Sequence, residues 1–266
     1  MKSNKINKRD IILNSIIDAY IEQNIPIGSS ELGSRMDINI SASTIRVYFK
    51  KLSDEGEIMQ LHISGGRIPT VNAMQKYWND FFYDFSDKIV INDEDILKFL
   101  CDKHELYCMI FGNLDQNLEE ILNLNSRFLV LNFTKDEIVI KYNEKVEQFL
   151  SNLIGVSLNK LELVSSQVGL SELRSKIREL KRTKIYFQEN EILALKMFEN
   201  KKIKSILEPS FENFMKKKLT FSPLFEDGFM GLKLAANYKG EDSIMVCSGS
   251  VYANYIRFLN NIKEVA

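Results

Sequence analysis

The sequence predicts a multidomain protein. We expect an N-terminal winged helix-turn-helix, mostly α with a β-hairpin wing, followed by an α+β domain. Three helical patterns follow one another within the first 56 residues, and a Gly-Gly-Arg turn between two strand-like segments comes directly after them. Beyond residue 86, strands and helices interleave without a regular βαβ repeat. The predicted domains are therefore residues 1–86, which include a linker helix, and residues 87–266.

Composition limits the class of protein. The chain has 266 residues, 45% of them hydrophobic, which is enough for a substantial core. No apolar run approaches the roughly 18 residues of a membrane span, so we expect no membrane partner. Three scattered cysteines fit a reducing compartment, and a cytoplasmic location is expected. Because the net charge is only −1, the position of each basic residue says more about a nucleic-acid partner than the total does.

The first two helices are predicted from caps and apolar spacing. Asn7 can cap a helix whose apolar stripe includes Ile12 and Ile16, and Pro26 ends the pattern. Ser29 or Ser30 can then cap a short helix that reaches residue 36. Short links between these helices and the next one are typical of a helix-turn-helix.

The third helix carries the predicted recognition face. Ser41 can cap it, and Gly56 can end it after residue 55. At about 100° per residue, its apolar residues gather on one side, while hydroxyl and basic side chains share the other. Ser and Arg can bond base edges in a major groove and Lys can bind phosphate, although a solvated charged face is the alternative. The predicted DNA contacts on this helix are Ser41, Ser43, Thr44, Arg46, Val47, Lys50 and Lys51.

A wing is predicted directly after this helix. Residues 57–62 form a strand-like segment, residues 64–66 a glycine-rich turn and residues 67–70 the start of a returning strand. The turn lets the backbone approach a sugar-phosphate wall, and its arginine can enter a minor groove or bind phosphate. No Lys-Ser/Thr follows, which argues against a nucleotide phosphate loop. The predicted DNA contacts of the wing are His62, Ser64, Gly65, Gly66 and Arg67.

Two wing residues have alternative roles. His62 can bind a DNA phosphate, or it can bond a backbone carbonyl that shapes the wing. Arg67 can contact DNA, or it can form a salt bridge with Asp54 or Glu55 at the end of the third helix.

Three motifs in this part of the chain are specific in order and spacing. They are "PIGSSEL" at residues 26–32, "SASTIR" at 41–46 with "LSDEGEI" at 52–58, and "HISGGRIPT" at 62–70. They resemble the GS-x-x-L helix, the S-x-x-TIR recognition helix and the H-x-S-x-GRIPT wing of the bacterial heat-inducible transcription repressor HrcA family. Residues 229–262, from "FMGLKL" to "FLNNI", resemble the closing strand-and-helix unit of that family more loosely.

The resemblance implies a function and an architecture. It implies a homodimeric repressor of chaperone genes that binds an inverted-repeat operator on double-stranded DNA, needs no cofactor, and depends on the GroE chaperonin for its active folded state. It also implies that the α+β domain is GAF-like and carries a small inserted dimerisation element, which we expect at about residues 185–221. The chain departs from the family in being short before its last strands, so we expect this element to be reduced. "YFKKL" at residues 48–52 departs from the acidic and amide residues usual in the family, so operator preference is expected to differ in detail.

The rest of the chain is read from its own patterns. Residues 71–85 predict the linker helix, and the acidic, polar residues 86–95 predict a domain boundary. Strands are expected at 106–111, 128–133 and 138–142, and helices at 96–103, 146–153 and 170–181.

Residues suited to catalysis or metal binding are sparse. Cys101, His104, Cys108 and Cys247 could suggest a metal site, but Cys108 lies in a segment that predicts a buried strand, where cysteine is usually a small core residue. With two histidines in the chain, nucleophilic catalysis has little support, and an enzyme is not expected. The alternative function is a metabolite-responsive winged-helix regulator with a ligand in the GAF-like domain.

Overall fold

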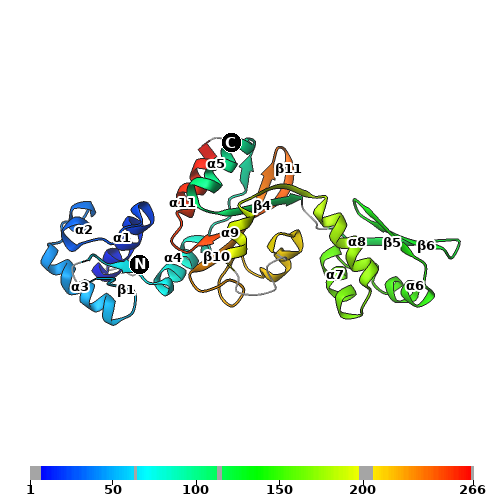
Figure 1. Cartoon of the computed structure of the whole chain (residues 1–266), viewed down its shortest axis with the longest axis horizontal. Helices are drawn as coiled ribbons and strands as arrows, with labels where there is room; N and C mark the ends of the chain where they lie inside the picture. The colour runs from blue at the N-terminus through cyan, green and yellow to red at the C-terminus, as the bar shows by residue number, and fades with distance from the viewer. Residues whose placement is uncertain (1–6, 63–64, 113–115, 198–205, 265–266) are drawn as a thin grey trace, which may run out of the picture.

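The computed structural model describes residues 7–62, 65–112, 116–197 and 206–264, which form three bodies in a row (Figure 1). The N-terminal body is helical and carries a short pair of strands. The central body is built on a six-stranded sheet, and the third body on a separate three-stranded sheet. Most strand pairs are antiparallel, so the predicted α+β class is confirmed for the chain beyond the N-terminal body.

The N-terminal body has the predicted three helices. Asn7 caps the first and Ser41 the third, as expected, with each side chain accepting a backbone N–H bond. The second helix differs in its cap, because Gly28 precedes it and gives no side-chain bond, while Ser29 is its first residue. The elements are α1 (Lys8–Gln23), α2 (Ser29–Arg35), α3 (Ala42–Asp54), β1 (Ile58–Met59) and β2 (Ile68–Pro69).

A linker helix joins this body to the central one. Helix α4 (Val71–Tyr83) buries Trp78 in the same core as Ile17 of α1 and Tyr255 near the end of the chain. The indole Nε1 of Trp78 donates a 2.7 Å hydrogen bond to the carbonyl of Val251. The linker helix is therefore part of the packing between the two bodies.

The central sheet has the strand order β3-β10-β11-β4-β8, with β9 also paired to β10. Its first strand lies in the segment expected to be a domain boundary, where β3 pairs in parallel with β10. The strands are β3 (Ile89–Ile91), β4 (Tyr107–Gly112), β8 (Ile185–Glu189), β9 (Leu219–Thr220), β10 (Phe229–Tyr238) and β11 (Glu241–Ser250).

Helices cover both faces of this sheet. Strand β4 is buried throughout: Cys108 and Ile110 enter the core that α4, α5 (Glu94–His104) and α11 (Tyr255–Glu264) cover. Tyr107 and Phe111 enter the core on the other face, under α9 (Glu191–Lys196) and the 3-10 helix η1 (Pro209–Phe214). The buried strand expected at residues 106–111 is confirmed, and Cys108 is a core residue there.

The third body lies between β4 and β8 in the chain and has its own hydrophobic core. Its elements are β5 (Leu118–Leu124), β6 (Phe128–Phe133), β7 (Glu137–Lys141), α6 (Glu144–Ser151), α7 (Leu158–Gln167) and α8 (Ser171–Arg182). The dimerisation element was expected at about residues 185–221; within that range β8 pairs with β4 of the central sheet, and η1 covers that sheet. Within the described part of the chain, no helix is long and apolar enough to cross a membrane.

Candidate nucleic-acid interface

Helix α3 separates a buried face from an exposed polar one. Ile45 and Leu52 are completely buried and Phe49 nearly so. Arg46, Lys50 and the other side chains of the opposite face are exposed, and Val47 is 69% exposed. An apolar side chain so far in solvent, between two basic ones, is suited to contact with a partner surface. The exposed residues among those predicted on this helix are Ser41, Ser43, Arg46, Val47, Lys50 and Lys51, while Thr44 is half-buried.

The start of α3 is tied together by hydroxyl groups. The Ser41 hydroxyl accepts a 3.2 Å bond from the backbone N–H of Thr44 and lies 2.9 Å from the hydroxyls of Ser43 and Thr44. The Nε of Arg46 donates a 3.1 Å bond to the hydroxyl of Ser29 at the start of α2. Ser41 and Thr44 therefore hold the helix start, and the bond to Ser29 orients the guanidinium along the exposed face.

The strand pair after α3 is shorter than predicted. Met59 pairs with Ile68, and the chain beyond Met59 leaves the ladder. The backbone N–H of Gly65 donates a 2.9 Å bond to the carbonyl of His62, while the His62 side chain is exposed. The carbonyl of His62 therefore takes part in the turn, and its ring faces solvent. Ser64 lies outside the described residues.

Gly66 is required by an internal contact. A Cβ atom there would lie 2.5–2.6 Å from the backbone atoms of Ile27. Ile27 and Arg67 form an isolated antiparallel bridge, with N–H to carbonyl distances of 3.0 and 2.8 Å. The strand pair is thus joined to the link between α1 and α2, and this close approach explains why glycine occupies position 66.

Arg67 does not form the salt bridge considered for it. Glu55 pairs instead with Arg9 of α1, at 2.6 Å. The Nε atom of Arg67 is buried, and among the residues that the structure describes it has no hydrogen-bond partner. An orphaned guanidinium donor is available to an incoming acceptor.

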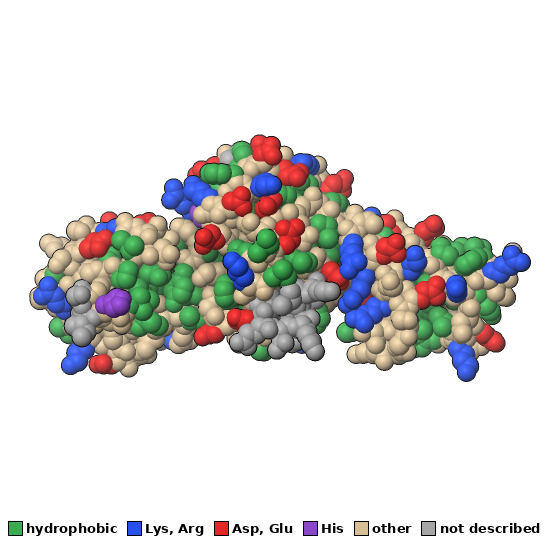
Figure 2. Space-filling view, in the orientation of Figure 1, with side chains coloured by type: hydrophobic (Ala, Val, Ile, Leu, Met, Phe, Trp, Pro, Cys, Tyr) green, Lys and Arg blue, Asp and Glu red, His purple; other side chains and the backbone are tan. Residues whose placement is uncertain are grey.

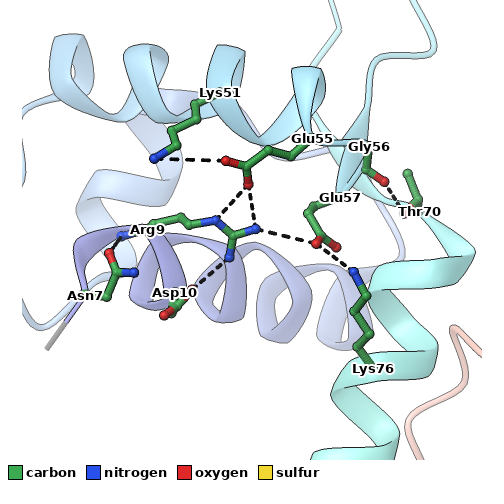
Figure 3. Close-up of polar contacts among 9 residues, drawn as sticks. All are labelled: Asn7, Arg9, Asp10, Lys51, Glu55, Gly56, Glu57, Thr70 and Lys76. Atoms are coloured by element: carbon green, nitrogen blue, oxygen red, sulfur yellow. Dashed lines mark hydrogen bonds and ion pairs between the residues drawn. The ribbon is translucent and has the colours of Figure 1, made fainter. Parts of the chain in front are cut away.

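An ion-pair network at the end of α3, between α1 and α4, was not predicted from the sequence (Figure 3). Arg9 contacts Glu55, Asp10 and the buried Glu57, whose Oε1 also lies 2.8 Å from the Nζ of Lys76 on α4. The hydrogen bond that Arg9 donates to the carboxylate of Glu55 raises the pKa of Arg9. The network joins the end of α3 to α1 and α4, and no local pattern predicts it because its members lie far apart in the chain.

A second set of contacts joins the strand pair to the central body. The hydroxyl of Tyr252, just after β11, donates a 3.1 Å bond to the carbonyl of Pro69 in β2. Its ring meets Tyr20 of α1 edge-on, with ring centroids 5.3 Å apart. Burial raises the pKa of Tyr252 to about 12, so the phenol remains a donor at neutral pH.

Comparison with known proteins identifies the family. The model of the HrcA C-terminal domain matches residues 78–266, which is most of the chain. This chain belongs to the HrcA family. The suspected resemblance is thereby confirmed.

Relatives of this HrcA family member cover almost its whole length. The heat-inducible transcription repressor HrcA of Helicobacter pylori strain J99 is 26% identical over 97% of this chain and 96% of its own. The same identity and coverage hold for that of Helicobacter pylori strain 26695. A solved structure titled as a hypothetical protein at 2.2 Å resolution is 20% identical, covers 98% of this chain and 97% of its own, and has a TM-score of 0.45.

Proposed function

We propose that this HrcA family member is a repressor of heat-shock gene transcription that binds double-stranded DNA through its N-terminal body. The observation that carries the proposal is the exposed face of α3, where Arg46, Val47 and Lys50 lie opposite a fully buried apolar face. The names of its relatives as heat-inducible transcription repressors support the same function. In this function the protein works in the cytoplasm, without a cofactor and without catalysis.

The N-terminal body would act as a winged helix. Helix α3 would lie in the major groove, with Ser43 and Arg46 at base edges and Val47 against a thymine methyl group. Lys50 and Lys51 would bind phosphates, which set affinity rather than sequence preference. Figure 2 shows exposed hydrophobic side chains beside a histidine on the same body.

The pair of strands β1 and β2 would form the wing. Arg67 would bind a phosphate or enter the minor groove, since its Nε lacks a partner among the described residues. His62, Ser64 and Gly65 would lie along the sugar-phosphate backbone. Gly66 would have a supporting role, because its lack of a side chain lets the strand pair close on Ile27.

Operator binding would require a homodimer. One such body contacts too few phosphates to hold a specific site, whereas two tethered copies read both halves of an inverted repeat. We propose that residues 116–184 are the inserted dimerisation element and that the central body is the GAF-like one. Leu122, Val130 and Val139 lie opposite one another across β5, β6 and β7. None of the three belongs to the core of the third body; Leu122 and Val139 are 39% and 42% exposed, and Val130 between them is 9% exposed.

The decisive test is fluorescence anisotropy with the full chain, an inverted-repeat operator of the HrcA family and a scrambled duplex. Each titration would be repeated across a salt series, with and without GroE chaperonin. We expect the operator to be preferred by at least about 10³, within the usual range for specific sites. We also expect GroE to raise the fraction of chain that is active.

One outcome would contradict the proposed repressor, and another would contradict only its dependence on GroE. Weak, salt-dependent binding with no preference for the operator would leave only a general affinity for nucleic acid. If the chain prefers the operator, but GroE changes neither its affinity nor the fraction of active chain, the protein is a repressor that does not depend on the chaperonin.

A further inference from the structure

A polar cleft of about 600 Å³ lies between the end of α7 and one face of α8, from Ser171 to Arg182, in the third body. Hydroxyl and guanidinium groups dominate its lining, and those of α8 recur at three- and four-residue intervals, so they share one face of the helix. Such a lining is suited to an anion rather than to an apolar ligand. The side chains that matter here are Ser165, Ser171, Arg174, Ser175, Arg178 and Arg182.

Arg174 is the first indication of a site for an anionic ligand. Its side chain is half-buried, and its Nε is buried without a hydrogen-bond partner among the residues that the structure describes. A buried donor that lacks a partner is costly, and native structures rarely keep one without a reason. An oxygen atom of a ligand in the cleft would satisfy it.

The cleft also has an excess of positive charge. Arg178 and the completely buried Lys181 share the carboxylate of Glu162, at 3.1 and 2.7 Å. Arg182 pairs with Glu208, and Glu179, which also lines the cleft, pairs with Lys176. That leaves one cation of the Arg178–Lys181 pair, together with Arg174, without an equivalent negative charge. In Figure 2, Lys and Arg side chains gather over α7 and α8 where the third body meets the central one.

The start of α8 lies at one end of the same cleft, where the N–H of Ser171 bonds the carbonyl of Gly169 at 2.9 Å and the next N–H groups follow. Leu170 precedes the helix and gives no side-chain cap, and Gly169 before it has a φ of +77°. The first N–H groups of a helix without a side-chain cap can bind an anion. This feature alone would not define a site, but it lies in the cleft that contains the orphaned Arg174.

From these contacts we propose that the cleft binds a small molecule bearing a phosphate or diphosphate group. Arg174 would bind two phosphate oxygens through its fork of N–H groups, with Arg178 and the hydroxyls of Ser171 and Ser175 around them. The volume is within the range of sites for nucleotide-sized ligands. This site lies in a different body from the proposed DNA contacts, so it goes beyond the proposed function.

The site is connected to the central body. Glu162, the partner of Arg178, also accepts a 3.0 Å bond from the hydroxyl of Ser210 in η1. Asn159 of α7 donates a further 3.1 Å bond to Glu212 of η1. A ligand that draws Arg178 toward its phosphate therefore changes the contacts that hold the third body against the central one. The ligand would act as an effector.

Isothermal titration calorimetry on the full chain, without DNA, tests the site. Sodium pyrophosphate and ATP are the probes, and sodium chloride at matched ionic strength is the blank. We expect saturable binding with one site per chain, at least tenfold weaker in Arg174→Gln and intermediate in Arg174→Lys, which keeps the charge but loses the fork. Lys145→Gln removes an exposed cation from α6 of the same body and is expected to bind as the unmodified chain does.

The two probes distinguish the source of the phosphate. ATP binding at least tenfold tighter than pyrophosphate identifies a nucleotide, and equal affinities identify the phosphate groups as the recognised feature. Circular dichroism checks that each variant is folded. If Arg174→Gln does not fold, Arg174→Lys is compared with the unmodified chain instead.

The proposal is overturned if neither probe binds saturably. It is also overturned if Lys145→Gln weakens binding as much as Arg174→Gln does, since that indicates general charge attraction. If Arg174→Gln weakens operator binding but leaves the binding of both probes unchanged, the arginines of α8 would instead be assigned to DNA binding.

Discussion

Gly66 leaves no room for a side chain, because a Cβ atom would lie 2.5 Å from the backbone of Ile27. We expect Gly66→Ala to lower the free energy of unfolding by about 2 kcal/mol, since backbone must move to relieve the overlap. Urea denaturation measures the loss. Gly65→Ala is the matched control: its Cβ would lie 3.2 Å from the carbonyl of His62, a milder contact. Equal losses in the two variants would contradict the importance of the Ile27–Arg67 bridge.

Arg46 and Lys50 lie on the same exposed face but are expected to act differently on DNA. Arg46→Ala should weaken operator binding by about 1–3 kcal/mol and change binding to scrambled DNA much less, because base-edge bonds carry the preference. Lys50→Ala should weaken both alike and reduce the salt slope by about one, because it loses one phosphate contact. Anisotropy over a salt series measures both. The assignment of roles is wrong if the two variants affect both duplexes equally.

At the scale of residues, the sequence predicted those features that depend on the helical repeat or on residue type alone. The exposed face of α3 follows from the helical repeat, and the caps Asn7 and Ser41 follow from residue type. The bridge between Ile27 and Arg67 and the pairing of Arg9 with Glu55 could not be predicted, because each joins residues about 40 or more positions apart.

At the scale of elements, the contact between α7, α8 and η1 is centred on a buried ion pair. Burial acts to raise the pKa of Glu162, but Lys181, Arg178 and Ser210 together hold it below its usual value. Because the folded-state pKa is lowered, the charged carboxylate stabilises the fold above the unfolded value of about 4.3, and this contribution is lost as pH falls through the folded-state pKa.

Glu162→Gln should therefore destabilise the chain most at neutral pH. We expect a loss of about 3 kcal/mol there, because Lys181 is left buried without its counter-charge. The difference from the unmodified chain should shrink as pH falls through the lowered folded-state pKa of Glu162, where the native carboxyl group is itself neutralised. Urea midpoints over a series from pH 6.5 down to the lowest pH at which the chain stays folded provide the measurement. Glu144→Gln, an exposed change on α6, is the control, and a pH-independent loss in Glu162→Gln would contradict the argument.

Elements were predicted where their pattern is strong. The helices near residues 96–103, 146–153 and 170–181 correspond to α5, α6 and α8 within a few residues, and β6 and β7 lie where expected. Strand β5 was missed because "LEEILNL" has no clean alternation and contains a register shift. Strand β3 was missed because acidic residues flank its three residues, and its pairing with β10 is long-range.

At the scale of the whole molecule, the apolar row across β5, β6 and β7 gives a test of dimerisation. Val139→Asp should convert the proposed dimer into a monomer and weaken operator binding at least tenfold, because tethering of two DNA-binding bodies is lost. Analytical ultracentrifugation at micromolar concentration and anisotropy supply the two readouts. Ile154→Asp is the control, since Ile154 is also in the third body and is 52% exposed but lies outside the three strands. A chain that is monomeric without any substitution, yet binds the operator tightly, would contradict the proposal.

The location of the third body could not be predicted, because it depends on which strands become neighbours. Strands β4 and β8 are antiparallel neighbours, so the third body, described from residue 116 to residue 184, occupies the place of a hairpin turn. The backbone N–H of Gly112 bonds the carbonyl of Lys184 at 2.8 Å, where the chain leaves the central sheet and returns to it.

A body attached at two adjacent points pivots less freely than one attached by a single strand of chain. On the opposite side, the linker helix is packed into the central core through Trp78. The row of bodies in Figure 1 is therefore expected to keep a fixed length. If two chains join through their third bodies, this length sets the distance between the two copies of α3. Operator half-sites would then be selected by their spacing as well as by their bases.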